Sequence, residues 1–452
     1  MNRESVGEWD ESLYATSAWE MTHSGNLVGT TFDGTLDYYN SKPPLNVWLI
    51  AVFFSWFGTS LFTLRLASAT CGWLTVWVLQ RWTKRAFGPV VSLVSSLVLA
   101  SAFGFLHEHA ARSGNADAPL TLLFLLAVVV MWTSYDNSRR LIWLGPILAG
   151  VFLLKGLAVL QPLLFIALVG TVATRSARAG SPWKPLLAAA ATFLLLVSAW
   201  LVARWRVDGW HFFRQMVAYD LLGTSLTTLE GHAHGPLYYF DVLQRYHYEW
   251  LSALLLVGLV ARRAWRTWVR EVAMSLRARQ PLAVIVMAWV VATVALPTVL
   301  QTRIAWYLNP FYPLFATLVG LVFARALEAT WTMSRVRQGA IWAAVIAALV
   351  VAESKTIWRL YRVTNLDTSV QGLLLSSTRP DQGQRVFRDR HVRSEAFVVR
   401  ALCHAEFRVT DGVPGRPADA RPGDLVVREG DGLFADLRLL GRADGHSVYQ
   451  VE

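Results

Sequence analysis

Long apolar runs recur along most of this chain and are separated by short polar segments. Residues 90–105, 119–132, 186–202, 282–300 and 339–351 carry no charged side chain. Each run approaches the roughly 20 residues that an α-helix needs to cross the hydrocarbon core of a bilayer. One soluble core cannot bury so many helices that are apolar on every side. The pattern predicts an all-α polytopic membrane protein.

The apolar runs and the segments around them predict about 10–13 transmembrane helices. The segment 42–58 has a short apolar part, so it is expected to lie along the membrane interface. The remaining predicted spans are residues 66–81, 88–106, 118–134, 141–154, 157–173, 186–203, 249–261, 281–300, 305–324 and 339–352.

Three domains are predicted from these boundaries. Residues 1–65 form a first extracytoplasmic loop with juxtamembrane helices, and residues 66–352 form the multi-span domain. Residues 353–452 form a small extracytoplasmic domain with α/β or β structure. Short apolar alternations in this last part, such as Asp424–Val427, are typical of strands.

The distribution of Lys and Arg among the loops indicates which side of the membrane each loop faces. The 42 Lys and Arg exceed the 31 Asp and Glu, which gives a net charge of +11. In a soluble protein this excess would favour nucleic-acid binding, but here it gathers in alternate short loops, as in cytoplasmic loops of membrane proteins. We therefore expect no nucleic-acid partner, and the loops with His, Asp and Glu face the exterior. The basic loops are residues 81–85, 139–140, 175–184, 262–279 and 325–337.

The cysteines and the N-terminal segment limit the classes of protein to consider. Two cysteines, Cys71 and Cys403, exclude a disulfide framework. The polar, acidic segment Met1–Tyr14 has no signal peptide, although the topology places it outside. Two explanations stay open: a short N-terminal tail that crosses unaided, or a first helix upstream of Met1 that was lost through a start codon placed too far downstream.

The polar motifs that are candidates for catalysis or binding all lie on the predicted outer side. Ionisable residues at membrane depth are costly and tend to be functional. In chain order the motifs are Asp10-Glu11-Ser12-Leu13-Tyr14-Ala15, Glu20-Met21, Lys42-Pro43-Pro44-Leu45-Asn46-Val47-Trp48, Arg65, Asp117, Lys155-Gly156, His232-Ala233-His234-Gly235-Pro236-Leu237-Tyr238-Tyr239 and Arg303-Ile304-Ala305-Trp306-Tyr307-Leu308-Asn309-Pro310.

This ordered set resembles the polyprenyl-phosphate-sugar glycosyltransferases of the GT-C superfamily. The branch with the aminoarabinose–lipid A transferases and the protein O-mannosyltransferase-like bacterial enzymes is the most similar. The resemblance covers residues 9–315 and rests on the order and shared side of the motifs, since no single motif is diagnostic. It implies inverting transfer of a monosaccharide from a polyprenyl (undecaprenyl) phosphate donor to a lipid, surface-glycan or protein acceptor. The reaction would occur at the periplasmic face of the bacterial inner membrane, in contact with membrane lipid.

The resemblance also implies roles for three acids. Asp10 matches the catalytic carboxylate and is expected to act as the base. Glu11 would orient groups or raise the pKa of its neighbour, and Asp117 matches a second catalytic acid. The alternatives are a solvated acidic loop for Asp10 and Glu11, and a helix N-cap for Asp117.

Cationic residues are expected to hold the donor phosphate. Lys42 precedes two prolines, which present it on a rigid turn. Arg65, Lys155 and Arg303 are further phosphate candidates, and Tyr307 follows in the late Trp-Tyr motif. The alternative for each cation is snorkelling at the interface.

The histidine loop is expected to contact the sugar or to bind a divalent metal. Relatives carry one His before Gly-Pro, so either His232 or His234 is the counterpart. A metal site would need further ligands, such as Glu11, Glu230 or His107. A monophosphate donor requires no cofactor, so metal use is left open beside a satisfied loop histidine.

The alternative from a different class is a membrane transporter or flippase of lipid-linked sugars. Transporters place charges at mid-membrane on broken helices and often contain inverted repeats. Here the ionisable residues lie at loop level on one side, and no repeat is evident. The sequence therefore favours the enzyme.

Overall fold

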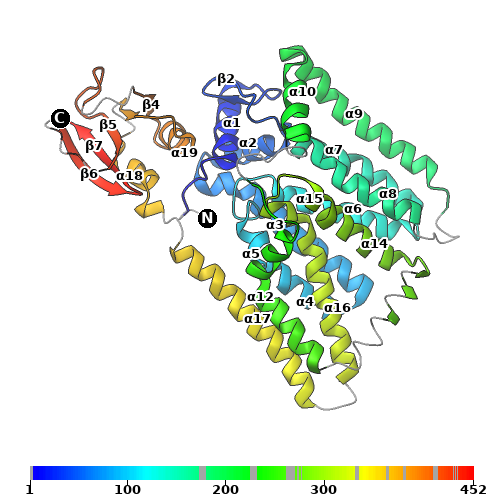
Figure 1. Cartoon of the computed structure of the whole chain (residues 1–452). Helices are drawn as coiled ribbons and strands as arrows, with labels where there is room; N and C mark the ends of the chain where they lie inside the picture. The colour runs from blue at the N-terminus through cyan, green and yellow to red at the C-terminus, as the bar shows by residue number, and fades with distance from the viewer. Residues whose placement is uncertain are drawn as a thin grey trace. The chain divides into compact units, whose positions relative to one another are not determined.

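The computed structural model describes most of the chain as two compact units (Figure 1). Unit 1 contains Met1–Asn40, Val47–Ala67 and Ile357–Glu452, and unit 2 contains Ser41–Asn46 and Ser68–Thr356. The residues described are 4–172, 180–223, 232–260, 270–271, 274–275, 277–330, 335–362, 366–379, 383–410, 416–430, 432, 434 and 436–452.

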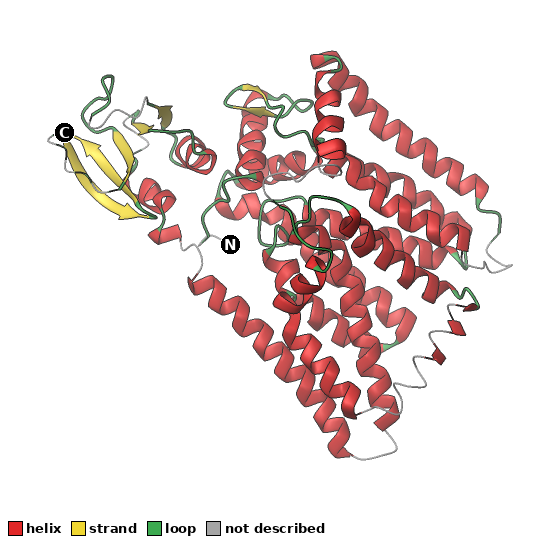
Figure 2. Cartoon of the chain, in the orientation of Figure 1, coloured by secondary structure: helices red, strands yellow, loops and turns green. Residues whose placement is uncertain are grey.

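The regular elements described in unit 2 are all helices, joined by loops (Figure 2). The chain passes between the units after Asn40 and then within α2, α3 and α17. The helices wholly or mainly in unit 2 are α3 (Leu61–Phe87), α4 (Pro89–Ala100), α5 (Phe103–His107), α6 (Asp117–Ser134), η1 (Ser138–Trp143), α7 (Leu144–Lys155), η2 (Gly156–Val159), α8 (Leu160–Val172), α9 (Trp183–Asp208), α10 (His211–Met216), η4 (Val217–Gly223), α12 (Tyr238–Val260), α14 (Pro281–Val290), η6 (Val291–Ala295), α15 (Leu296–Val299), η7 (Ala305–Phe311), α16 (Tyr312–Thr330) and α17 (Arg335–Arg362).

The predicted polytopic helical architecture is confirmed. Within the described residues, 7 helical stretches are long and apolar enough to cross a membrane. The other predicted spans fall on shorter helices such as α4, or on α12. The stretches are Leu61–Phe87, Asp117–Ser134, Ser138–Thr171, Trp183–Asp208, Pro281–Val299, Ala305–Ala329 and Arg335–Arg359.

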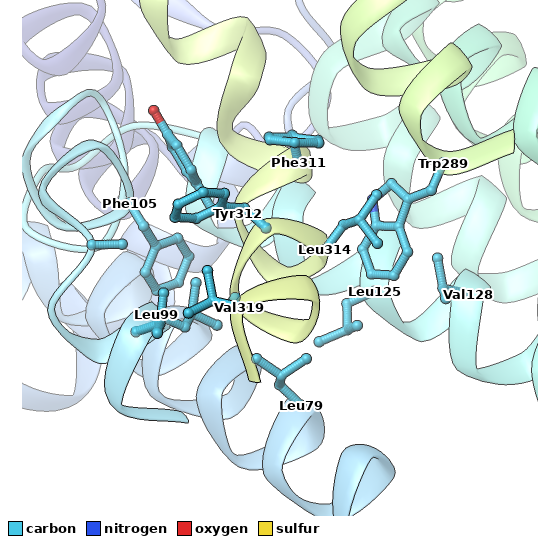
Figure 3. Close-up of a cluster of buried hydrophobic side chains, with 14 of the residues drawn as sticks. Leu79, Leu99, Phe105, Leu125, Val128, Trp289, Phe311, Tyr312, Leu314 and Val319 are labelled. Atoms are coloured by element: carbon cyan, nitrogen blue, oxygen red, sulfur yellow. The ribbon is translucent and has the colours of Figure 1, made fainter. Parts of the chain in front are cut away.

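The core of unit 2 is built from side chains of helices that are distant in sequence. Figure 3 shows Leu79, Leu99, Leu125, Trp289 and Val319 converging from α3, α4, α6, α14 and α16. Helices α4 and α16 pack so closely that only glycine fits at position 320. A Cβ there would lie 2.4 Å from the Oγ of Ser95. Small residues at such contacts let helix backbones approach each other, which is how membrane helices gain packing energy.

Unit 1 combines a five-stranded sheet with short helices (Figure 2). The strand order is β4-β3-β5-β7-β6, with β3 parallel to β4 and β5, and β7 antiparallel to β5 and β6. The predicted small C-terminal domain with β structure is confirmed. The elements are α1 (Asp10–Ser24), β1 (Thr31–Phe32), β2 (Thr35–Leu36), α2 (Leu45–Phe57), η8 (Leu366–Thr368), α18 (Val370–Ser377), β3 (Arg385–Arg388), α19 (Arg393–Phe397), η10 (Val398–Leu402), β4 (Glu406–Val409), β5 (Leu425–Glu429), β6 (Leu437–Ala443) and β7 (His446–Val451).

The N-terminal segment and the C-terminal domain share one hydrophobic core. Tyr14 and Ala18 of α1 belong to the same buried cluster as Leu374 of α18 and Phe397 of α19. The sequence predicts residues 1–65 and 353–452 as separate domains, whereas the structure groups most of both in unit 1. The helix that begins at Asp10 therefore packs against residues that come more than three hundred positions later in the chain.

One buried carboxyl makes the stability of unit 1 depend on pH. Burial raises the pKa of Glu395 to about 7; the nearby Arg388 opposes this shift and Glu8 adds to it. Because the pKa in the folded state exceeds the unfolded value of about 4.3, the stabilisation is complete below that value and is lost as the pH rises through about 7. We expect a lower thermal midpoint at pH 8 than at pH 5.5, and Glu395→Gln should remove much of this difference. An unchanged pH dependence in the variant would contradict the assignment.

Candidate active site

An apolar pocket of about 220 Å³ in unit 2 holds two lysines and one carboxylate. Lys42, Asp117 and Lys155 supply its charged groups, and Trp306 and Tyr307 line it with their rings. The remaining walls are mainly aliphatic: Leu120, Leu157, Ala158, Leu160, Leu296, Pro297, Leu300 and Pro310, with Gln161. The pocket thus combines a surface suited to hydrocarbon with a few convergent polar groups, as ligand sites usually do.

Lys155 and Asp117 form a buried ion pair in this pocket. The Lys155 Nζ donates to Asp117 Oδ1 at 2.7 Å, and the side chains are 13% and 3% exposed. Lys155 is the last residue of α7, where its charge complements the carboxyl end of the helix. Gly156 follows with a φ of 52° and ends the helix there. The Lys155 ammonium also lies 5.9 Å from the centre of the Tyr307 ring.

Asp117 begins α6 but does not cap it. The N-cap residue is Ala116, and it makes no side-chain capping bond. The helix-cap interpretation of Asp117 is therefore wrong, because its carboxylate binds Lys155 instead. The structure places two sequence candidates in direct contact and supports a shared role for them.

The turn that carries Lys42 is fixed to the loop before α6. Pro43 and Pro44 are buried, and α2 begins directly after them. The Asn46 Nδ2 donates to the Gly114 carbonyl at 3.0 Å. This bond joins the Lys-Pro-Pro turn to the loop that leads into Asp117, which explains how Lys42 comes to line the same pocket.

Arg303 is tied to the histidine loop. Its backbone N–H donates to the His232 carbonyl at 3.2 Å, its Nε donates to the Thr298 carbonyl at 2.9 Å, and its Nη1 donates to the His234 carbonyl. These bonds favour a positioning role for Arg303 over direct phosphate binding. The phosphate role proposed for it from the sequence gains no support here.

The two histidines of this loop make different ring contacts. His234 stacks on Tyr238 with ring centroids 4.0 Å apart, and His232 meets the edge of Trp306 at 6.3 Å. His109 stacks on Trp306 at 3.8 Å, a contact that sequence spacing does not signal. Within the described residues no group of three or more His, Cys, Asp or Glu is arranged to hold a metal ion. Glu230, a suggested metal ligand, lies outside those residues.

In unit 1, Asp10 is the first residue of α1 and is half-buried. An acidic side chain in the first turn is favoured by the helix dipole. Its neighbour Trp9 is 55% exposed. The Arg393 guanidinium from α19 lies 5.1 Å from the Trp9 ring and 4.8 Å from the Tyr39 ring. An aromatic and cationic surface therefore adjoins the carboxylate expected to be catalytic.

Glu11 and Arg65 are paired with each other rather than presented to a substrate. The Arg65 Nε and Nη2 donate to the two oxygens of Glu11 at 2.8 and 3.1 Å, and Arg65 is 2% exposed. The Arg65 guanidinium also donates to the carbonyls of Glu4 and Ser5, each at 2.9 Å. These bonds favour a structural role for the pair. We therefore do not place Arg65 among the phosphate ligands.

Arg65→Lys tests this structural role. A lysine keeps the charge but cannot reproduce the forked geometry of the guanidinium, so the Glu4 and Ser5 carbonyls would lose donors. We expect a loss of about 1–3 kcal/mol in the free energy of unfolding, with little change in KM for a donor lipid. Thermal unfolding and donor titration measure the two effects. A selective rise in KM with unchanged stability would restore Arg65 as a phosphate ligand.

Comparisons with known proteins bear on both the fold and the pocket. Residues 41–202 match the family model described as dolichyl-phosphate-mannose-protein mannosyltransferase. Over its whole length the chain is similar to the crystal structure of ArnT from Cupriavidus metallidurans bound to undecaprenyl phosphate, with a TM-score of 0.73, 15% identity, and coverage of 99% of this chain and 94% of that one. The chain has the ArnT fold. The fold that the resemblance implies is thereby confirmed.

Other matches cover a smaller part of the chain or of the matched protein. The oligosaccharyltransferase of Archaeoglobus fulgidus, tethered with an acceptor peptide, gives a TM-score of 0.55 at 11% identity and covers 94% of this chain and 65% of that one. The undecaprenyl phosphate-alpha-4-amino-4-deoxy-L-arabinose arabinosyl transferases of Pseudomonas savastanoi and Pseudomonas aeruginosa strain UCBPP-PA14 are 36% and 35% identical over 30% and 46% of this chain. These matches span only 26% and 39% of the length of the two transferases. The family-model match includes Lys42, Asp117 and Lys155.

Proposed function

We propose that this chain is an inverting glycosyltransferase that moves a monosaccharide from a polyprenyl (undecaprenyl) phosphate to an acceptor at the extracytoplasmic face of the inner membrane. The observation that carries the proposal is the pocket of unit 2, where Lys42 and Lys155 stand among aliphatic walls. A polyprenyl phosphate is a hydrocarbon chain that ends in a phosphate, so its two parts match the two parts of this lining.

The charges of the pocket suit a phosphate that becomes more negative during the reaction. As the bond between the anomeric carbon and the phosphate oxygen breaks, its electron pair stays on the phosphate. Two ammonium groups held in an apolar setting stabilise that charge more strongly than they would in water. Asp117 holds Lys155 in place and neutralises part of its charge when the donor is absent. Tyr307, beside the same ammonium, gives it a second contact.

The other half of the reaction requires a base. An acceptor oxygen forms the new bond to the anomeric carbon from the side opposite the phosphate, and its proton passes to Asp10. No general acid is needed, because the released lipid phosphate is already a stable anion. The assignment of Asp10 is supported by its motif and by its half-buried place at the start of α1. It is proposed here as the base.

The donor sugar and the acceptor are proposed from the relatives. The Pseudomonas proteins are named as transferases of 4-amino-4-deoxy-L-arabinose from undecaprenyl phosphate. The segment with the pocket lysines lies in the match to the mannosyltransferase family model, residues 41–202. That sugar on undecaprenyl phosphate is therefore the first donor to test. The acceptor is a lipid, a surface glycan or a protein, with the lipid class tested first.

The decisive experiment is a transfer assay on the full chain in membrane vesicles. Undecaprenyl phosphate carrying a radiolabelled sugar is supplied, and label is followed into the lipid, glycan and protein fractions. We expect label in one acceptor fraction and release of undecaprenyl phosphate. A Pseudomonas arabinosyl transferase in parallel vesicles shows that the conditions work. No label in any fraction would overturn the proposal, and movement of intact donor across the vesicle membrane would indicate a flippase.

A further inference from the structure

The segment that leads into Asp10 is held from two directions within unit 1. On one side Arg65 donates to the carbonyls of Glu4 and Ser5, each at 2.9 Å. On the other side the backbone of Val6 exchanges two bonds with the Gln371 side chain of α18. The Val6 N–H donates to Gln371 Oε1 at 2.8 Å, and Gln371 Nε2 donates to the Val6 carbonyl at 3.0 Å.

Glu8, two residues before Asp10, binds the start of α19. Its carboxylate accepts from the backbone N–H groups of Arg393 and Ser394 at 2.8 and 3.0 Å, and from the Ser394 hydroxyl at 2.6 Å. These are the first two residues of α19. A carboxylate with three donors is held by charge-assisted bonds, which are roughly twice as strong as neutral ones.

These contacts determine where α1 lies, and they are not needed for the helix to form. The helix would still begin near Asp10 without them, because its own residues Leu13, Tyr14 and Ala18 are buried. What Gln371 and Glu8 add is a fixed location for Val6 and Glu8 in the segment before Asp10, which ties that segment to the C-terminal domain. A misplacement of about 1 Å in a reacting group can lower a rate by about 10²-fold.

We propose that Glu8 and Gln371 are positioning residues, through which the C-terminal domain sets the place of the Asp10 carboxylate. This inference rests on the proposed function, with Asp10 as the base. The Arg393 side chain over Trp9 and Tyr39 extends the same link, because the Glu8 carboxylate holds the backbone from which Arg393 projects. The domain thus contributes to catalysis through the position of Asp10.

Glu8→Ala and Gln371→Ala test the link in the full chain. We expect each to lower kcat by about 10–10²-fold, with an unchanged KM for the donor, because the pocket lysines belong to unit 2. Glu8→Gln keeps one accepting oxygen and should recover part of the loss. The matched control is Glu429→Ala, at the exposed end of β5.

The outcomes separate this inference from the proposed function. If the unchanged protein transfers no sugar, the proposed function fails. If it transfers sugar and both Glu8→Ala and Gln371→Ala match Glu429→Ala within twofold, only the positioning role is overturned. The same holds if the loss appears in the donor KM instead of kcat. Should Glu8→Ala prove unfolded, folded Glu8→Gln and Gln371→Ala decide the matter by the same comparison.

Discussion

Asp10→Asn is expected to lower sugar transfer by about 10²–10⁴-fold while the protein stays folded and inserted. Asparagine keeps the size of the side chain and can still accept a hydrogen bond at the start of α1, but it cannot take a proton from the acceptor. The initial rate at saturating donor measures the effect. The thermal midpoint of the variant should lie close to that of the unchanged protein.

The matched control is Asp136→Asn, which removes an exposed carboxylate after α6. It should leave the rate unchanged. Donor binding should be retained in Asp10→Asn, because the lysines of the pocket are untouched. If Asp10→Asn transferred sugar at a near-normal rate, Asp10 would have no part in the chemistry. The positioning role of Glu8 would then lose its purpose as well.

The membrane helices were predictable because their signal is local. An apolar run records the hydrocarbon environment residue by residue, so the predicted spans 118–134 and 141–154 nearly coincide with α6 and α7. An apolar run does not show where a helix continues into polar residues. For example, α17 extends from Arg335 to Arg362, although the predicted span is 339–352. The short strands of the C-terminal domain were predictable from alternation, as for β5 at Leu425–Glu429.

The pairings within the candidate site were not predictable, because they join residues far apart in sequence. The sequence offers Glu11 and Arg65 as separate catalytic and phosphate candidates, and only the structure shows that they bind each other across 54 positions. Helix-end rules suggest a cap for Asp117, whereas its partner is Lys155, 38 positions away. Nothing near Glu8 indicates that its carboxylate binds α19, 385 positions later.

The same distinction explains which candidates the structure retains. Lys42 and Lys155 line an apolar pocket, a property that depends on the walls around them and not on their own motifs. Arg303 has a similar motif context, yet its donors meet the carbonyls of Thr298 and His234. A motif identifies which residues carry charge, and packing decides whether that charge is available to a ligand.

Lys155→Met gives the second large effect that we expect. It removes one of the two ammonium groups of the pocket, and turnover should fall by about 10²–10³-fold. It also leaves Asp117 buried and without its cation, which should lower the free energy of unfolding by about 3–5 kcal/mol. Turnover in vesicles and thermal unfolding measure the two losses. Lys184→Met, at an exposed position in α9, is the matched control.

The double variant Lys155→Met with Asp117→Asn separates the two losses. Removing both charges ends the penalty of an unpaired buried carboxylate, so most of the stability should return. Turnover should stay low, because the phosphate still lacks an ammonium partner. If turnover recovered together with stability, the pair would serve packing alone and the phosphate would have to be held elsewhere. If Lys155→Met retained turnover within threefold of the control, the apolar pocket would lose its role as the donor site.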